Sequence, residues 1–296
     1  MQGFILLNKP QGVTSFGAVA KIKRIAKEKR VGHTGTLDPM ATGVLPVLLG
    51  RATALSSIML DANKRYTATV KLGITTDTED ITGTVLTENP VNVSALQIED
   101  ALKQFTGKIT QTPPMYSALK KDGVRLYDLA RQGKSVEIPS REVEIFNINL
   151  ISPLDVENCF KIDVLVSKGT YIRSLARDIG EYLGCGATLS ALERTDTCGF
   201  SIENCVKLDD LNDDNIAAYI QSEENAVRHL RECRVTQKQA VRFSNGGQLG
   251  FERLHIENIS NGELFRVKCD NVFIGIGIAD IENQRLNIKC IINNYK

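Results

Sequence analysis

An aspartate inside a glycine-rich segment has the residue type and the surroundings that chemistry would require. Residues 31–43 read VGHTGTLDPMATG, which places Asp38 among three glycines and directly before Pro39. Glycine adopts backbone angles that other residues reach only at a cost, and proline biases the residue before it towards an extended conformation. A carboxylate held in this way could act as a nucleophile, a base or a ligand. A structural turn is the more common explanation of such a loop, so the pattern alone leaves both open.

The elements on both sides of this segment must position the aspartate. Residues 3–10 (GFILLNKP) predict a buried strand that enters a turn, and Thr14 or Ser15 can cap the helix that follows. Residues 21–30 are mostly basic with a single acidic side chain, and a solvated helix face explains them as well as contact with a phosphate backbone does. After the segment, VLPVLL predicts another buried strand, and residues 52–59 predict a short helix.

Alternating and capping patterns predict the elements of the central region. Strands are expected at residues 64–72, 143–150 and 159–167, where apolar and polar side chains alternate. Helices are expected at residues 94–105, which open with a Ser-x-x-Gln capping box, and at residues 171–183. Two further stretches predict less regular structure: residues 75–84 a polar loop, and residues 120–140 a surface hairpin rich in lysine, arginine and glycine.

Composition and charge bound the class of protein. A chain of 296 residues with 42% hydrophobic and 24% charged residues is typical of a folded globular protein, and its length predicts two domains. We expect these at residues 1–230 and 231–296, after an acidic, Asn-rich approach to a linker at residues 209–215. From residue 233 the runs LFRVKC, VFIGIGIAD and RLNIKCII indicate a small all-β domain. The net charge of +1 gives no global signal for nucleic acid, so any RNA-binding surface must be local.

The cysteines and the apolar runs indicate the compartment. Seven cysteines are scattered without a CxxC pair or Cys/His ligand spacing, which predicts reduced thiols in a cytoplasmic protein and no metal site. The N-terminus lacks the basic leader and the cleavage site of a signal peptide. No window approaches the roughly 18 apolar residues that a membrane-spanning helix needs. We therefore expect no association with a membrane.

The string GHTGTLDPMATGVLP resembles the central motif of the bacterial tRNA pseudouridine-55 synthases, the TruB-like family. The resemblance continues in KRYTATVKLG, PPMYSALKKDGVRLYDLARQG and SKGTYIRSLARDIGEYLGCGATLSALERT, and is weaker towards the C-terminus. It implies an α+β fold with a mixed, mainly antiparallel sheet flanked by helices (the pseudouridine synthase fold), followed by a small all-β domain of the PUA type.

The activity implied by the resemblance is the isomerisation of uridine 55 in the T-arm of tRNA to pseudouridine. The C1′–N1 bond of the uridine is cut, the uracil turns, and the bond is remade through C5. Nothing is oxidised, so no metal or redox cofactor is required. The target base must be flipped out of its stack, at a cost of a few kcal/mol. The implied partner is tRNA, through its T-arm and with its acceptor stem as a further candidate contact, and the protein is expected to be a monomer with no obligate protein partner.

Five residues map onto the family positions that form the site. Asp38 is the implied catalytic residue, acting as nucleophile or base. A buried carboxylate needs a cationic or donor partner, and Arg173 is at the family position for it. Tyr66 is implied to pack against the target base and to assist proton transfer at C5, although a core tyrosine would explain the strand pattern equally well. Tyr171 and Leu192 are implied to contact the uracil and to wall the pocket.

Two further residues have implied supporting roles. His33 is implied to stack on or wedge under a flipped base, and a structural histidine explains it equally well. Lys9, in the N-terminal Lys-Pro element, is expected to support the motif loop rather than to act in catalysis. The chain departs from the family after Leu192, where two basic residues are usual and Glu193-Arg194 stands instead. We therefore assign no RNA contact to Glu193, whereas residues 120–140 are at the place of an RNA-gripping insertion.

Three alternatives stay open from sequence. A guide-RNA-dependent (H/ACA-type) pseudouridine synthase shares much of the motif, but such proteins are generally more basic. A non-catalytic RNA-binding or tRNA-folding protein could use the same surface without turnover. A hydrolase of glycosidic bonds would normally need a second placed carboxylate, and none is suggested near Asp38.

Overall fold

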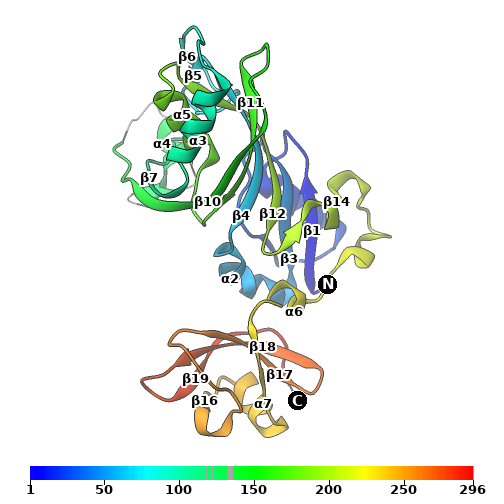
Figure 1. Ribbon diagram of the computed structural model, residues 1–296. Helices are drawn as coiled ribbons and strands as arrows, with labels where there is room; N and C mark the ends of the chain where they lie inside the picture. Colours follow the sequence, from blue (N-terminus) through cyan, green and yellow to red (C-terminus); the bar gives the residue numbers. More distant parts are fainter. Residues whose placement is uncertain (118, 122, 132–135, 296) are drawn as a thin grey trace.

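The computed structural model describes residues 1–117, 119–121, 123–131 and 136–295. Figure 1 shows two parts: a large curved sheet with helices, built from the blue to yellow-green chain, and a smaller sheet at the C-terminal end in orange and red. The large sheet has ten strands and the small sheet has five. The predicted fold class, a mixed sheet with helices followed by a small β-rich part, is therefore confirmed.

The large sheet is mainly antiparallel. Its main path has the order β14-β1-β3-β12-β4-β11-β10-β7, with β2 added beside β3 and β13 beside β12. Only two of its pairings are parallel, β1 with β14 and β3 with β12. The strand bounds are β1 Gly3–Lys9, β2 Val31–His33, β3 Thr42–Leu49, β4 Lys64–Leu72, β7 Gly107–Gln111, β10 Arg141–Ser152, β11 Cys159–Val166, β12 Ala187–Thr197, β13 Phe200–Ser201 and β14 Val206–Lys207.

The centre of this sheet brings the motif segment against β12. In the parallel pairing of β3 with β12, Gly43 lies opposite Arg194. Gly43 has a φ of +102°, and a β-carbon there would lie 2.2 Å from the carbonyl oxygen of Arg194. No side chain fits so close to a neighbouring backbone, so this position requires glycine. On the other side of β12, Arg194 pairs with Tyr66 and Leu192 with Ala68 of β4.

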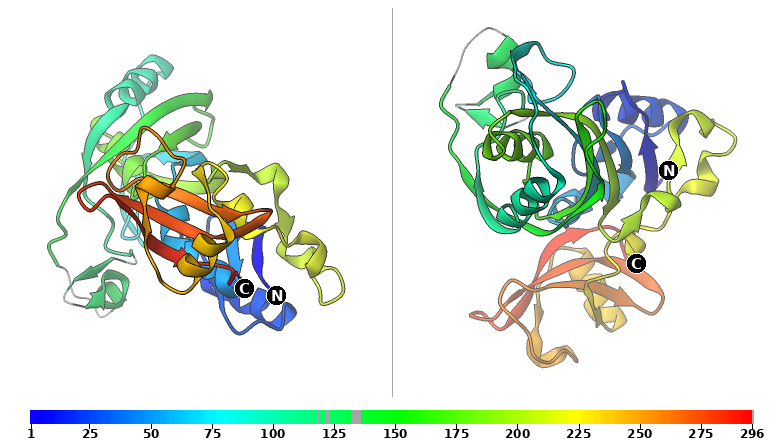
Figure 2. Two further views of the ribbon diagram at one scale, coloured as in Figure 1. Left: turned by 90° about the horizontal axis from the view of Figure 1, so that it is seen from below. Right: turned by 45° about the horizontal axis from the view of Figure 1, so that its top comes forward.

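The helices follow the predicted capping patterns. Thr14 caps α1 (Ser15–Ile25) by accepting from the Gly17 N–H, and Ser94 opens α3 (Ala95–Gln104) with the predicted capping box. The strongly amphipathic α5 (Ile172–Tyr182) buries one face against the sheet, which curves around α3 and α5 in the right-hand view of Figure 2. The bounds of the other helices in these parts are η1 Gly50–Leu55, α2 Ser56–Leu60, α4 Leu126–Arg131, η2 Ile202–Asn204, η3 Leu208–Asp210, η4 Ile216–Tyr219 and α6 Glu223–Ala226.

Two local expectations need correction. Residues 75–84 are not only a loop, because β5 (Ile74–Thr76) and β6 (Val85–Glu88) pair as a hairpin around the turn at residues 77–83. The basic run at residues 21–30 is only partly helical, because α1 ends at Ile25 and Lys27 has a positive φ of 50°. In residues 209–215, Asp209 pairs with Lys21 of α1 at 2.7 Å, and the expected domain boundary after them stays a prediction. These contacts depend on cross-strand and long-range partners that local patterns do not contain.

The basic stretch at residues 120–140 is described in part. Its backbone forms the short antiparallel pair β8 (Lys120–Lys121) and β9 (Val124–Arg125), followed by α4. Residues 122 and 132–135 lie outside the described residues. The expected RNA-gripping role of this stretch stays a prediction.

The C-terminal sheet has the order β15-β17-β18-β19-β16, and the helix α7 (Gln237–Ser244) packs with it around a core of its own. The strand bounds are β15 Arg231–Arg234, β16 Leu249–Gly250, β17 Leu264–Cys269, β18 Val272–Asp280 and β19 Arg285–Ile291, with η5 at Phe251–Arg253. A second apolar cluster joins this sheet to the large one: Phe273, Ile276 and Ile292 belong to the same buried group as Phe4 and Phe200. Among the described residues, no helix is long and apolar enough to cross a membrane.

Candidate active site

A cavity of about 340 Å³ opens beside the motif loop, which is the segment between β2 and β3 that carries Asp38. Five of the predicted site residues line it: Asp38, Tyr66, Tyr171, Arg173 and Leu192. They come from four different elements, namely the motif loop, β4, the start of α5, and β12. The structure thus brings together residues that are far apart in the sequence. Lys9 and His33 are not among the lining residues.

The loop that presents Asp38 is pinned on both sides of the aspartate. The Ser15 hydroxyl accepts a hydrogen bond from the Leu37 N–H (2.9 Å) and donates one to the Leu37 carbonyl (3.0 Å). On the other side, the Gly12 N–H donates to the Pro39 carbonyl over 2.8 Å. The Asp38 side chain remains 35% exposed. The carboxylate is therefore held by a rigid backbone while part of it stays open to the cavity.

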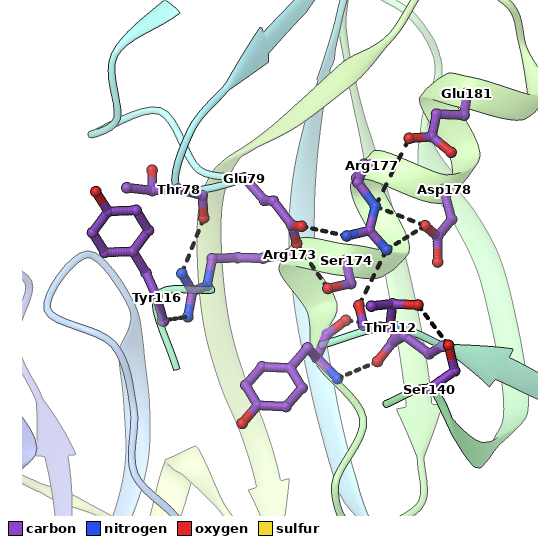
Figure 3. A network of polar contacts seen from close by, with 12 residues as sticks. Thr78, Glu79, Thr112, Tyr116, Ser140, Arg173, Ser174, Arg177, Asp178 and Glu181 are labelled. Atoms are coloured by element: carbon purple, nitrogen blue, oxygen red, sulfur yellow. Dashed lines mark hydrogen bonds and ion pairs between the residues drawn. The ribbon is translucent and has the colours of Figure 1, made fainter. Parts of the chain in front are cut away.

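Arg173 joins the carboxylate to two other segments. Its side chain is 4% exposed, and its Nε lies 2.9 Å from Asp38 Oδ2. The Nε–H does not point at this oxygen, so the contact is an ion pair rather than a well-formed hydrogen bond. Nη1 donates to the Thr78 carbonyl (3.0 Å) and Nη2 to the Tyr116 carbonyl (2.8 Å), as Figure 3 shows. These two carbonyls hold the guanidinium in one orientation.

Asp80 is a second carboxylate at this guanidinium, which the sequence interpretation missed. It is 5% exposed, and its Oδ2 lies 3.6 Å from Arg173 Nη1. Its Oδ1 accepts hydrogen bonds from the Thr78 hydroxyl (3.0 Å) and from the backbone and hydroxyl of Thr82 (3.0 and 2.6 Å). The acidic, threonine-rich string TDTEDITG was the available signal, but it was interpreted as a polar loop. Two carboxylates therefore share one buried cation.

The surroundings of Asp38 raise its pKa above the ordinary value. Burial is the largest cause, and the negative charge of Asp80 acts in the same direction. The positive charges of Arg173 and Lys9 oppose it and lower the pKa. Because burial dominates, the carboxylate gives up its proton at a higher pH than a solvent-exposed aspartate does.

Arg194 clamps the two ends of the motif loop, a role that the sequence interpretation did not assign. Its side chain is 1% exposed. Nε donates to the Val44 carbonyl over 2.7 Å, and Nη2 donates to the Gly35 carbonyl over 2.9 Å. Gly35 has a φ of +70°, and a β-carbon there would lie 3.1 Å from Arg194 Nη1. Arg194, the basic residue that follows Leu192 and Glu193, thus binds backbone carbonyls of the protein itself.

Two buried lysines, Lys9 and Lys64, lie close enough to Arg194 to be affected by its charge. Lys9 is fully buried, and its Nζ donates to the carbonyls of Pro10 (2.8 Å) and Val13 (2.7 Å). Lys64 lines the cavity and donates to the carbonyls of Leu60 and Ala62. Burial lowers the pKa of each lysine to about 8. Through the Pro10 and Val13 carbonyls, Lys9 holds the turn before α1. Its expected role in supporting the motif loop stays a prediction.

The walls of the cavity are formed by half-buried and buried side chains. Tyr66 on β4 is 7% exposed and Leu192 on β12 is 8% exposed. The backbone of Tyr171, at the N-cap of α5, is held by the Gln111 side chain, which donates to its carbonyl (3.0 Å) and accepts from its N–H (2.8 Å). The guanidinium of Arg141 lies 5.0 Å from the centroid of the Tyr171 ring. Gln111 and Arg141 were not predicted, because neither stands in a motif.

His33 lies on β2, outside the cavity lining. Its Nε2 is 3.2 Å from the Thr36 hydroxyl. Burial and the charge of Arg194 lower its pKa, so the imidazole is neutral at neutral pH. A neutral aromatic ring at this place is compatible with stacking on a base, and that role stays a prediction. Among the described residues, no group of three or more His, Cys, Asp and Glu side chains could hold a metal ion.

The fold of this chain is that of a pseudouridine synthase. Over 99% of this chain and 85% of the other, the structure is similar to that of a protein solved as a "Cbf5-Nop10-Gar1 Complex", with a TM-score of 0.78 and 28% sequence identity. A second solved structure, an H/ACA RNP bound to a substrate RNA containing 2′-deoxyuridine, is similar with a TM-score of 0.75 and 27% identity, over 98% of this chain and 85% of that one.

The sequence narrows this class to one family. The family model of the TruB pseudouridylate synthase N-terminal domain matches residues 23–172, and that of the tRNA pseudouridylate synthase B C-terminal domain matches residues 173–233. A protein of Clostridium perfringens named tRNA pseudouridine synthase B is 42% identical over 97% of this chain and 98% of its own. A protein of the same name in Chromobacterium violaceum is 40% identical over 99% of this chain and 95% of its own. The chain belongs to the TruB family of pseudouridylate synthases, and it is an enzyme of that class.

Proposed function

We propose that this enzyme isomerises uridine 55 in the T-arm of tRNA to pseudouridine, with Asp38 as the catalytic residue. The observation that carries the proposal is the pairing of Asp38 with Arg173 at 2.9 Å inside the cavity of about 340 Å³. This volume lies within the roughly 300–1,000 Å³ of small-molecule sites, and its walls include tyrosine and leucine side chains. A flipped uridine would lie over the carboxylate with its base against Tyr66, Tyr171 and Leu192.

The reaction balances without a cofactor. The C1′–N1 bond breaks, a C1′–C5 bond forms, and the proton of C5 is lost while N1 gains one. An ionised Asp38 can attack the ribose, add to C6 of the uracil, or remove a sugar proton, and the three routes share the need for an ionised carboxylate under the nucleotide. Arg173 favours the ionised form of that carboxylate against the effect of burial, and Tyr66 lies where it can assist the proton transfer at C5. Lys9 supports the motif loop, and His33 stacks beside the everted base.

The printed names of the relatives support tRNA as the substrate. Proteins named tRNA pseudouridine synthase B match at 40–43% identity, whereas the two solved structures with Cbf5 or H/ACA in their titles match at 27–28%. We therefore infer a stand-alone enzyme that acts on tRNA as a monomer in the cytoplasm, rather than one that needs a guide RNA and partner proteins. Residues 231–296 would form a PUA-like domain that follows the catalytic domain at residues 1–230 and contacts the acceptor stem.

Incubation of the purified protein with an unmodified tRNA transcript, followed by mapping of pseudouridine, tests this function. We expect a product at position 55 without any added RNA or protein, and none in a transcript with cytidine at that position. The variant Asp38→Asn should bind tRNA near the wild-type affinity and form no product. Product at another position would remove the substrate assignment, and turnover by Asp38→Asn would remove the catalytic assignment. Turnover only in the presence of a guide RNA would favour the H/ACA-type alternative.

A further inference from the structure

A second arginine lies one helical turn after Arg173 on α5. Residues four apart on a helix project from the same face, so Arg177 points towards the same neighbouring segments as Arg173. Its Nη1 pairs with Glu79 Oε1, and its Nη2 donates to the Thr112 carbonyl over 3.2 Å. Figure 3 shows the Arg173 guanidinium on the left and the Arg177 guanidinium on the right, with the Glu79 carboxylate between them beside Ser174. Arg177 is not among the residues that line the cavity.

The two arginines hold the same two segments. Arg173 donates to the Thr78 carbonyl in the turn at residues 77–83 and to the Tyr116 carbonyl in the extended stretch after β7. Arg177 contacts the same two segments, through the Glu79 carboxylate in that turn and the Thr112 carbonyl in that stretch. Two of the oxygen atoms at Arg173, the Thr78 carbonyl oxygen and Asp80 Oδ2, belong to the residues on either side of Glu79, so a fixed Glu79 also helps to fix these two.

The backbone conformation of Glu79 shows that its ion pair with Arg177 is formed at a cost in conformational free energy. Its φ is +61°, a left-handed conformation that a residue with a side chain adopts at a cost of roughly 1–2 kcal/mol. Its carboxylate is 14% exposed and accepts a hydrogen bond from the Ser174 hydroxyl over 2.7 Å. Arg173 is close enough to act on this carboxylate as well. Without Arg177, Glu79 would lose its ion-pair partner, and the turn that carries Thr78 and Asp80 would lose an anchor on α5.

We propose that Arg177, paired with Glu79, is a positioning residue that keeps the Arg173 guanidinium on Asp38. The ion pair ties Glu79, and with it the neighbouring Thr78 and Asp80, to α5, so that the oxygen atoms around the Arg173 guanidinium stay in place and its Nε stays beside Asp38 Oδ2. The contact to Thr112 holds the second segment in register with the first. This inference rests on the proposed role of Asp38, and it assigns to Arg177 no contact with the substrate.

Single-turnover kinetics with excess enzyme and saturating tRNA transcript test this role. Arg177→Met should lower the rate by about 10- to 100-fold, the scale expected when a reacting group is misplaced by about 1 Å, while the dissociation constant for tRNA changes less than about twofold. Arg177→Lys should recover part of the rate, because an ammonium can pair with Glu79 but cannot also reach Thr112 in the planar guanidinium geometry. In Glu79→Gln the ion pair with Arg177 is already absent, so adding Arg177→Met to it should cost less than in wild type.

Glu181→Gln is the matched control. Glu181 is 68% exposed and its Oε1 lies 3.9 Å from Arg177 Nε, so this variant removes a carboxylate from the same guanidinium without touching the turn at residues 77–83. Its rate should equal that of wild type. An equal loss of rate in Glu181→Gln and Glu79→Gln would overturn the inference, as would a wild-type rate for Arg177→Met.

The pH dependence of the single-turnover rate separates positioning from general stability. The groups that face Asp38 are Arg173, Asp80 and Lys9, and all three are retained in Arg177→Met. If Arg173 leaves Asp38, the acidic limb of the profile moves to higher pH; a variant that is only partly folded would lose amplitude with an unmoved limb, which would contradict the inference. Turnover by Asp38→Asn would instead remove the proposed function itself.

Discussion

Arg173 Nε lies 2.9 Å from Asp38 Oδ2, in a cavity whose walls come from β4, β12 and the start of α5. The arginine is almost fully buried, whereas the carboxylate is 35% exposed. Removing one member of a buried ion pair leaves the other without compensation, and it commonly costs more than the pair itself contributes. Arg173 therefore favours the ionised form of Asp38 against the effect of burial, and it also holds the segments of Thr78 and Tyr116.

The replacement of Arg173 should reduce turnover far more than binding. Arg173→Met removes the cation that opposes the raised pKa of Asp38, together with the donors to the Thr78 and Tyr116 carbonyls. We expect a rate lower by about 10²- to 10³-fold, the scale of one lost preorganised electrostatic contact. Single-turnover rates and filter binding of tRNA measure the two effects. A parallel loss of affinity and rate would indicate that Arg173 holds RNA instead of Asp38.

The activity should fall on the acidic side at a higher pH than an exposed aspartate would give. Burial raises the pKa of Asp38, so its ionised form appears only as the pH rises through that value. Asp80→Asn removes a negative charge that raises this pKa, so its acidic limb should move to lower pH. The measurement is the single-turnover rate across pH 4 to 8. A limb that moves upwards in Asp80→Asn would show that Asp80 acts mainly by orienting Arg173.

Gly43 should tolerate no side chain. A β-carbon would lie 2.2 Å from the Arg194 carbonyl oxygen, and the φ of +102° adds backbone strain. We expect Gly43→Ala to lower the free energy of unfolding by about 3 kcal/mol or more, since backbone atoms cannot give way as side chains do. Gly184→Ala is the matched control, because its φ is +77° and nothing lies within 4 Å of the added carbon. That variant should cost only about 1–2 kcal/mol in chemical denaturation.

Arg194 should matter for the shape of the motif loop. Arg194→Met leaves the buried carbonyls of Gly35 and Val44 without their donors, and each unsatisfied group costs about 1–3 kcal/mol. The thermal midpoint and the turnover rate should both fall, and Arg194→Lys should restore them only in part because an ammonium cannot span the two carbonyls. A wild-type rate with a lowered midpoint would mean that the loop keeps its shape without the clamp.

The burial of Lys9 should make stability depend on pH. Its pKa is lowered to about 8 in the folded protein from 10.5, so the unfolded chain binds more protons between these values. The contribution of this group to the free energy of unfolding therefore rises with pH from about 8 to 10.5, by on the order of 1 kcal/mol per pH unit. The difference in unfolding free energy between wild type and Lys9→Met, measured across that range, should follow this direction. A constant difference would contradict it.

The sequence identified the elements whose signals are local. The alternation at residues 64–72 predicts β4, and the Ser94–Gln97 pair predicts the start of α3, because periodicity and capping involve neighbours within one turn or strand. Residues 75–84 and 21–30 were less well predicted, since the β5–β6 pairing depends on a partner strand and since α1 ends at Ile25, before Lys27 with its positive φ, although the basic residues continue.

For the site, the sequence alone determined which residues belong to a shared motif, and so it named Asp38 and Arg173 and the walls around them. Only the tertiary structure decided what those residues meet: that Asp80 shares the guanidinium, that Arg194 serves the motif loop, and that His33 lies outside the cavity lining. The physical reason is that a side chain's charge and partners depend on burial and on segments distant in the chain. A motif specifies the residue type at a position, whereas the fold determines which charged side chains lie next to that residue.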